Sequence, residues 1–206
     1  MKTTVAAVDF GTSKIVTLVA FNSSSLRCDI VGAGIAAYDG FSEQGWNDPG
    51  AVNERIVTSI EDAERQSKKK IREINVGIPA AFSHAYAAEV TIQLNGTDPR
   101  VASTDIRKAF KEAEEKLKPN VIGIKVHATP AWFTIDNGKK TLEPVGKAGR
   151  ELKAMICFVY ADSFFVEDVR ARMVDLGYEV VGWYASAPGE MMLFLPEEAA
   201  ARTAYA

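Results

Sequence analysis

The sequence has 206 residues, 47% of them hydrophobic and 25% charged, a composition typical of a globular protein with one domain or two small ones. A formal net charge of -3 argues against nucleic-acid binding, which calls for clustered basic residues. No apolar run approaches the roughly 20 residues that span a bilayer or completes a signal-peptide core, so we expect a cytoplasmic protein.

The first third of the chain is rich in short β-forming runs. Residues 4–10 and 15–21 are apolar and flank the turn Gly11-Thr12-Ser13, which predicts a β-hairpin. Residues 28–37 predict a third strand and residues 74–79 a fourth.

A helix is expected between the third and fourth strands. Asp48-Pro49 predicts its start, because Asp caps helices and Pro suits the first helical position. An apolar stripe at helical spacing follows, made of Val52, Ile56, Ile60 and Ala63. The run Lys68-Lys69-Lys70 suits the negative end of this helix better than it suits a binding patch.

The middle of the chain predicts a strand-helix-strand-strand module. Strands are expected over residues 86–94, 121–136 and 151–160, with a bend at Pro130 in the second. A helix begins at Ser103 or Thr104 and ends near Pro119. This order indicates a compact α+β insert within a larger α/β domain.

The last third returns to the earlier pattern. A helix is expected from Asp162 or Ser163 to Gly177, then a strand over residues 178–183 and a final helix over residues 188–204. Cys28 and Cys157 lie in apolar stretches, so we expect buried, reduced cysteines rather than a disulfide.

The hairpin at residues 9–14 carries the sharpest chemical signal. Small residues at Gly11, Thr12 and Ser13 let backbone N–H groups approach a phosphate, and the two hydroxyls can add hydrogen bonds. Lys14 adds a positive charge, and Asp9 can hold a hydrated Mg²⁺ ion through water.

Other interpretations of these residues stay open. The hairpin fits a plain β-turn as readily as a phosphate site, and it is not a Walker A loop, because no Gly-Lys-Ser/Thr opens a helix. His84 and His127 have no carboxylate or cysteine at ligand spacing, so we expect core or surface histidines rather than metal ligands.

Beyond the hairpin, the order of segments resembles that of the FtsA family, the actin-like proteins of the bacterial division ring. The opening run from Val5 to Val19 is similar to the start of that family. The similarity continues through residues 30–34, 52–66 and 75–79, and through Pro130-Ala-Trp-Phe-Thr-Ile-Asp136.

This resemblance implies an actin-like, ribonuclease-H-like α/β fold. Residues 1–83 and 162–206 would form subdomain IA, and residues 84–161 would form the inserted 1C domain, an SHS2-type module. It also implies that the chain is truncated before the family's second phosphate hairpin. The loop at residues 146–150 matches the family only loosely, which leaves its partner contacts open.

The resemblance further implies a role in cell division. The longer protein would bind ATP with Mg²⁺ through Asp9, Gly11, Thr12, Ser13 and Lys14, with Asp9 contacting the metal through water and no catalytic residue assigned. It would polymerise as a cytoskeletal protein, with at most weak ATPase activity and none expected of these residues alone.

Partners are implied in the same way. FtsZ would bind a domain missing here, and a missing C-terminal helix would attach the protein to the inner face of the cell membrane at the septum. Residues 84–161 would contact neighbouring copies and later divisome proteins. The alternatives are a PilM-like pilus assembly protein, a small-molecule kinase of the same superfamily, and an interaction module without nucleotide.

Overall fold

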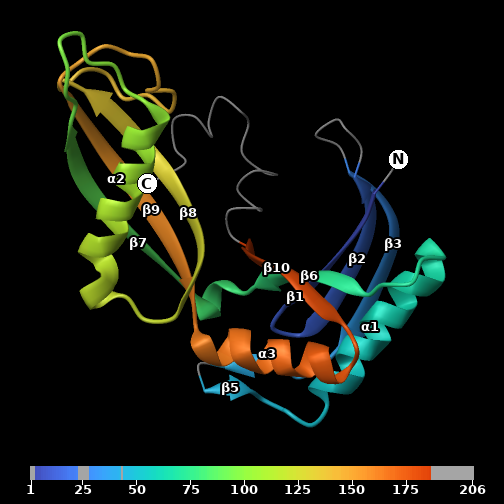
Figure 1. Cartoon of the computed structure of the whole chain (residues 1–206). Helices are drawn as coiled ribbons and strands as arrows, with labels where there is room; N and C mark the ends of the chain where they lie inside the picture. The colour runs from blue at the N-terminus through green and yellow to red at the C-terminus, as the bar shows by residue number, and fades with distance from the viewer. Residues whose placement is uncertain (1–2, 23–27, 43, 187–206) are drawn as a thin grey trace. The chain divides into compact units, whose positions relative to one another are not determined.

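The computed structural model describes residues 3–22, 28–42 and 44–186 (Figure 1). The described residues form two compact units, each described by itself: unit 1 contains those up to residue 83 and residues 161–186, and unit 2 contains residues 84–160. The helix expected over residues 188–204 lies outside the described residues.

Unit 1 is built on a five-stranded sheet in the order β10-β6-β1-β2-β3. Its strands are β1 (Thr3–Phe10), β2 (Lys14–Asn22), β3 (Cys28–Ala37), β6 (Glu73–Ile78) and β10 (Glu179–Ala185). The predicted hairpin is present, since β1 pairs antiparallel with β2. β6 runs parallel to β1, and β10 runs parallel to β6. The carboxyl ends of β1, β6 and β10 therefore lie next to one another at the same end of the sheet.

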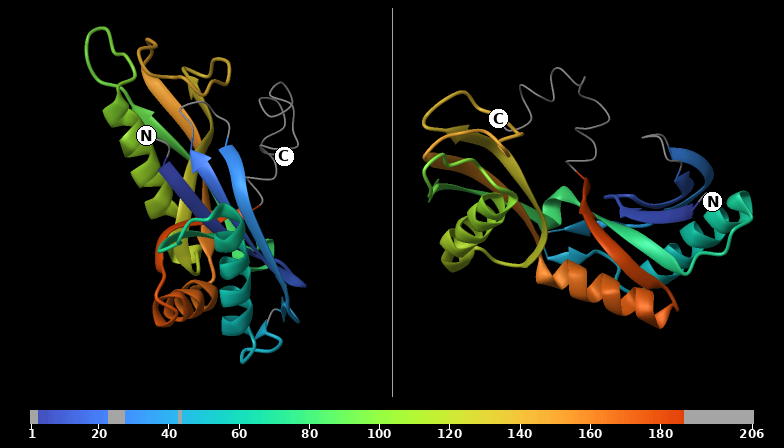
Figure 2. Two further views of the ribbon diagram at one scale, coloured as in Figure 1. Left: turned by 90° about the vertical axis from the view of Figure 1, so that its right-hand side faces the viewer. Right: turned by 45° about the horizontal axis from the view of Figure 1, so that its top comes forward.

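Helices cover one face of this sheet (Figure 2). They are α1 (Val52–Ser67) and α3 (Ser163–Asp175), with the short 3-10 helix η1 (Ala80–Phe82) before unit 2. α1 lies against β3 because Gly32 and Gly34 have no side chains there; a Cβ on either would collide with α1. Thr17 and Ser59 share a buried hydrogen bond of 2.9 Å between sheet and helix.

An aromatic cluster fixes α3 to the sheet. Phe10 of β1 packs edge-to-face on Phe165 of α3, with ring centroids 5.7 Å apart. Trp46 packs on both rings and donates its indole N–H to Asp168 Oδ2 at 2.6 Å. Two short strands that the sequence does not predict, β4 (Phe41–Ser42) and β5 (Gly45–Trp46), accompany this cluster, and β5 carries Trp46.

Two expectations about unit 1 are wrong. α1 begins at Val52 rather than at Pro49, because the Asp48 carboxylate accepts hydrogen bonds from the Gly50 and Ala51 N–H groups and closes a turn first. Cys28 is exposed rather than buried, since it opens the edge strand β3. Cys157, in unit 2, is half-buried rather than buried, and both cysteines are free.

Unit 2 is a three-stranded sheet with one helix, in the chain order strand-helix-strand-strand. It contains β7 (Ser83–Gln93), α2 (Ser103–Leu117), the 3-10 helix η2 (Lys118–Asn120), β8 (Ile124–Ile135) and β9 (Glu151–Ala161). β9 is the central strand, and its Leu152, Ile156 and Phe158 fill the core beneath α2. Pro130 lies within β8, an edge strand of this sheet, which is where proline is tolerated within sheets.

Candidate functional site

The turn between β1 and β2 presents the residues expected to meet a phosphate. The Gly11 N–H donates to the Lys14 carbonyl at 3.0 Å and closes the turn. Thr12, Ser13 and Lys14 are exposed at its tip. The sequence-predicted residues thus lie together, with hydroxyls and one positive charge facing solvent.

The segment after β3 braces this turn from one side. The Tyr38 hydroxyl donates to the Gly11 carbonyl at 2.6 Å, and the Tyr38 N–H donates to the Ser13 carbonyl at 3.1 Å. Gly40 has a φ of 72° and lies against the backbone of Thr12, where a Cβ would collide with the Thr12 carbonyl. The turn is therefore held by two hydrogen bonds from Tyr38 and by the close packing of Gly40. The bond from the Tyr38 hydroxyl and the packing of Gly40 each depend on the particular residue present.

Electrostatics keep the Tyr38 hydroxyl protonated. Burial raises the pKa of Tyr38 well above its ordinary value, and the negative charge of Asp9 raises it further. A protonated hydroxyl is what the hydrogen bond to Gly11 requires, because the Gly11 carbonyl can only accept. The sequence did not single out Tyr38 or Gly40, because their contact with the turn depends on the pairing of β3 with β2.

Asp9 lies at the end of β1, beside the ends of β6 and β10. On one side its carboxylate lies over Gly77 of β6, where a Cβ would be only 2.6 Å from Asp9 Oδ1. On another side Ser186, directly after β10, places its Oγ 3.1 Å from Asp9 Oδ1. The parallel strands have brought together residues 177 positions apart in the sequence.

A small cavity of about 200 Å³ opens beside Asp9 on the sheet face away from α1 and α3. Its walls are largely apolar and include Val16 and Leu18 of β2 and Tyr184 of β10. Leu18 and Tyr184 remain 36% and 61% exposed, so in the described part of the chain this face of the sheet is uncovered.

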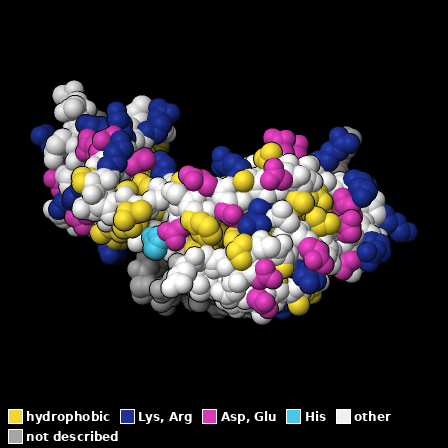
Figure 3. Space-filling model, turned by 90° about the horizontal axis from the view of Figure 1, so that it is seen from below, with side chains coloured by type: hydrophobic (Ala, Val, Ile, Leu, Met, Phe, Trp, Pro, Cys, Tyr) yellow, Lys and Arg dark blue, Asp and Glu magenta, His cyan; other side chains and the backbone are white. Residues whose placement is uncertain are grey.

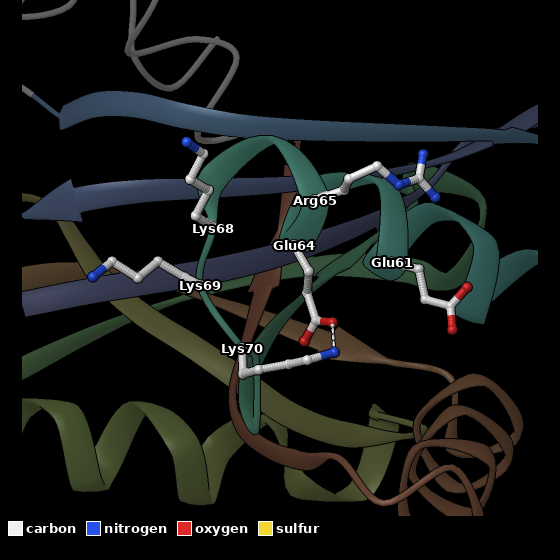
Figure 4. Close-up of a pocket in the computed structure, with 6 residues that line it drawn as sticks. All are labelled: Glu61, Glu64, Arg65, Lys68, Lys69 and Lys70. Atoms are coloured by element: carbon white, nitrogen blue, oxygen red, sulfur yellow. Dashed lines mark hydrogen bonds and ion pairs between the residues drawn. The ribbon is translucent and has the colours of Figure 1, made fainter.

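The lysine run at the end of α1 has a structural explanation, as Figure 4 shows. Lys70 Nζ lies 2.6 Å from Glu64 Oε2, while Glu64 Oε1 accepts the Ile71 N–H at 2.7 Å. Lys68 adopts a left-handed conformation that ends the helix, and Lys69 lies over the Phe21 ring. The six residues around this open pocket of about 430 Å³ thus include one ion pair and a helix terminus.

The described residues add few other candidates. Within them, no three His, Cys, Asp or Glu side chains gather as a metal site. No helix among them is both long and apolar enough to cross a membrane. On the face drawn in Figure 3, basic and acidic side chains are interspersed.

The fold is the mixed α/β fold of actin-like proteins. The chain superposes on a chain of the solved PilM-PilN type IV pilus biogenesis complex with a TM-score of 0.59, over 93% of this chain and 50% of that one. Sequence identity to it is 10%, so this likeness concerns the fold alone.

Sequence comparison points to a particular relative within that class, the cell division protein FtsA, and confirms the resemblance. Identity is 24% to FtsA of Neisseria meningitidis over 166 residues, which is 81% of this chain and 39% of that protein. It is 25% to FtsA of Enterococcus faecalis, over 69% of this chain and 32% of that protein. For Pseudomonas aeruginosa FtsA it is 23%, over 89% of this chain and 44% of that protein.

No model of a protein family matches the chain. The chain spans less than half the length of these FtsA relatives.

Proposed function

We propose that these 206 residues are the N-terminal part of an FtsA-like actin-family protein that binds ATP with Mg²⁺ and acts in bacterial cell division. The observation that carries the proposal is the braced turn at residues 9–14 in a chain whose sequence resembles FtsA. A plain β-turn needs no half-buried tyrosine holding it, no glycine packed on it and no carboxylate fixed beside it.

The residues at the turn fit the chemistry of a nucleotide phosphate. The backbone and hydroxyls of Thr12 and Ser13 would donate to phosphate oxygens, and Lys14 would supply a positive charge. Asp9 would accept hydrogen bonds from water on Mg²⁺, since that ion keeps most of its water shell in proteins. The phosphates would thereby offset the positive charge of Lys14, and Mg²⁺ would offset the negative charge of Asp9.

The larger role follows from the FtsA resemblance. Subdomain IA would comprise residues 1–83 and 162–206, and residues 84–161 would form a 1C-like module contacting a neighbouring copy and later division proteins. FtsZ and the inner membrane would be reached by parts of a longer protein outside these residues. Nucleotide would act chiefly as an assembly ligand, with weak hydrolysis at most.

A PilM-like pilus assembly protein is the second candidate, favoured by the shared fold. The two candidates differ in expected partner: an FtsA-like protein would bind the FtsZ tail, whereas the solved PilM chain belongs to a complex with PilN. Binding of an FtsZ tail peptide to the longest product of the gene separates them, and absence of that binding would favour the pilus candidate.

Calorimetry with ATP and Mg²⁺ tests the nucleotide proposal. We expect a micromolar Kd for the longest product of the gene and roughly a millimolar Kd for the 206 residues alone. The 206 residues would lack the phosphate contacts of the family's second hairpin, and each charge-assisted contact that is lost costs about 1.5–3 kcal/mol. Lys14→Ala should weaken binding to the longest product about tenfold or more.

Lys70→Ala is the matched control, because it removes an exposed lysine of the same unit that lies at the end of α1. Its ATP affinity should equal that of the unchanged protein. Equal affinities for Lys14→Ala and Lys70→Ala, or no binding of ATP by any of the proteins, would refute the nucleotide site.

A further inference from the structure

The end of β10 contributes a residue to the Asp9 region that no motif predicted. β6 lies between β1 and β10 in the sheet, so a residue after β10 must reach across the end of β6 to touch Asp9. Ser186 does so, with its Oγ 3.1 Å from Asp9 Oδ1 and 3.2 Å from the Ile78 carbonyl oxygen. One hydroxyl thus connects the ends of three parallel strands.

Gly77 makes this reach possible. A Cβ at position 77 would lie 2.6 Å from Asp9 Oδ1, closer than a carbon and a non-bonded oxygen can approach. Any other residue at position 77 would push the carboxylate away from its present place beside Ser186. Asp9, Gly77 and Ser186 therefore act as one arrangement, although they come from three strands.

The Ser186 hydroxyl has one proton and two acceptors at almost equal distance. It can donate to the Asp9 carboxylate or to the Ile78 carbonyl, and changing from one to the other requires only rotation of the O–H bond. While Asp9 Oδ1 accepts the Ser186 hydroxyl, water on a hydrated cation can donate to the other carboxylate oxygen, so the contact with Ser186 can persist when the cation is bound.

We propose that Ser186 is the positioning residue for the Asp9 carboxylate, holding it in the orientation that receives water on Mg²⁺ of the bound nucleotide. This rests on the proposed nucleotide function and adds a residue to it. Ser186 touches neither nucleotide nor metal. It fixes the carboxylate before the ligand arrives, so that less ordering is needed on binding.

The magnesium dependence of ATP binding tests this role. In the longest product of the gene, Ser186→Ala should weaken ATP binding about tenfold when Mg²⁺ is present and leave it unchanged within about twofold in EDTA. Gly77→Ala, which displaces Asp9 without touching Ser186, should show the same difference between the two conditions. Equal weakening in Mg²⁺ and in EDTA would mean that Ser186 only supports the fold, and no weakening would also refute the proposal.

Ser67→Ala is the matched control. Ser67 is also half-buried in unit 1 and also hydrogen-bonded to a backbone carbonyl, that of Glu64, but it lies at the end of α1. Its ATP affinity should match the unchanged protein in both conditions. Circular dichroism and thermal melting confirm that each variant is folded before affinities are compared.

A measurement without ligand separates this inference from the nucleotide function. In the 206-residue chain labelled with ¹³C, Ser186→Ala should shift the carboxyl ¹³C resonance of Asp9, while Ser67→Ala should not. An unmoved Asp9 resonance refutes the positioning role whatever the chain binds. A shifted resonance in a protein that binds no ATP supports the contact and refutes the nucleotide function.

Discussion

Both units pack helices against a β-sheet, but their polar side chains make contacts of different kinds. In unit 1, parallel strands bring Asp9 and Ser186 to one edge of the sheet from opposite ends of the sequence. In unit 2, polar contacts close a loop or lie on the surface, as where the Asp136 carboxylate accepts the N–H groups of Arg150 and Glu151. Unit 1 therefore brings distant polar groups together, as the proposed nucleotide site requires, whereas the polar contacts of unit 2 join segments of its own loops and surface.

The largest expected effect comes from variants that test whether the two units unfold independently. Phe158 in unit 2 and Phe165 in unit 1 are both buried almost completely, so truncating either to Ala should cost about 3–5 kcal/mol. Hydrogen exchange should show amide protection falling in β7 and β9 for Phe158→Ala, and in β1 and β6 for Phe165→Ala. Loss of protection throughout both units in either variant would mean that they unfold as one.

A smaller effect concerns the brace on the hairpin. Tyr38→Phe removes the hydrogen bond to Gly11 and should cost about 0.5–1.5 kcal/mol at neutral pH, measured by denaturant unfolding. Amide exchange at Thr12 and Ser13 should accelerate. Tyr178→Phe is the control in the same unit, and it should leave the exchange of these two amides unchanged.

The pH dependence of the same variant has a definite sign. The pKa of Tyr38 is raised, chiefly by burial, so the folded protein keeps a proton that the unfolded chain loses near pH 10. The stability from this group is complete below about pH 10 and falls as pH rises above it. Tyr38→Phe should lessen this alkaline loss; an identical loss in the variant would contradict the assignment.

The smallest expected effect is a difference in the rate of thiol modification between the two cysteines, one in each unit. Cys28 is exposed, whereas Cys157 is half-buried on β9 and burial raises the pKa of its thiol. A disulfide reagent at mildly alkaline pH should therefore modify Cys28 quickly and Cys157 slowly. Cys28→Ser should retain only the slow phase, and adding Phe158→Ala should accelerate it; two fast phases in the unchanged chain would contradict the burial of Cys157.

Most elements could be predicted from hydrophobic pattern and turn residues. The hairpin, the three long helices and the strand-helix-strand-strand order all have strong local signals, such as the alternation along β9 and the four-residue spacing of Val52, Ile56 and Ile60. The start of α1 was misplaced, because Asp48 caps a turn rather than the helix. β4 and β5 were missed, because two-residue strands have no period to detect.

For the candidate site, the sequence by itself determined the turn at residues 9–14, because small residues between two apolar runs are a local property. Only the tertiary structure decided what surrounds it. Tyr38 and Gly40 reach the turn because β3 returns beside β2, and Ser186 reaches Asp9 because β10 lies parallel to β6. Those contacts depend on strand order, which pairs distant segments through long-range packing and leaves no periodic pattern in the sequence.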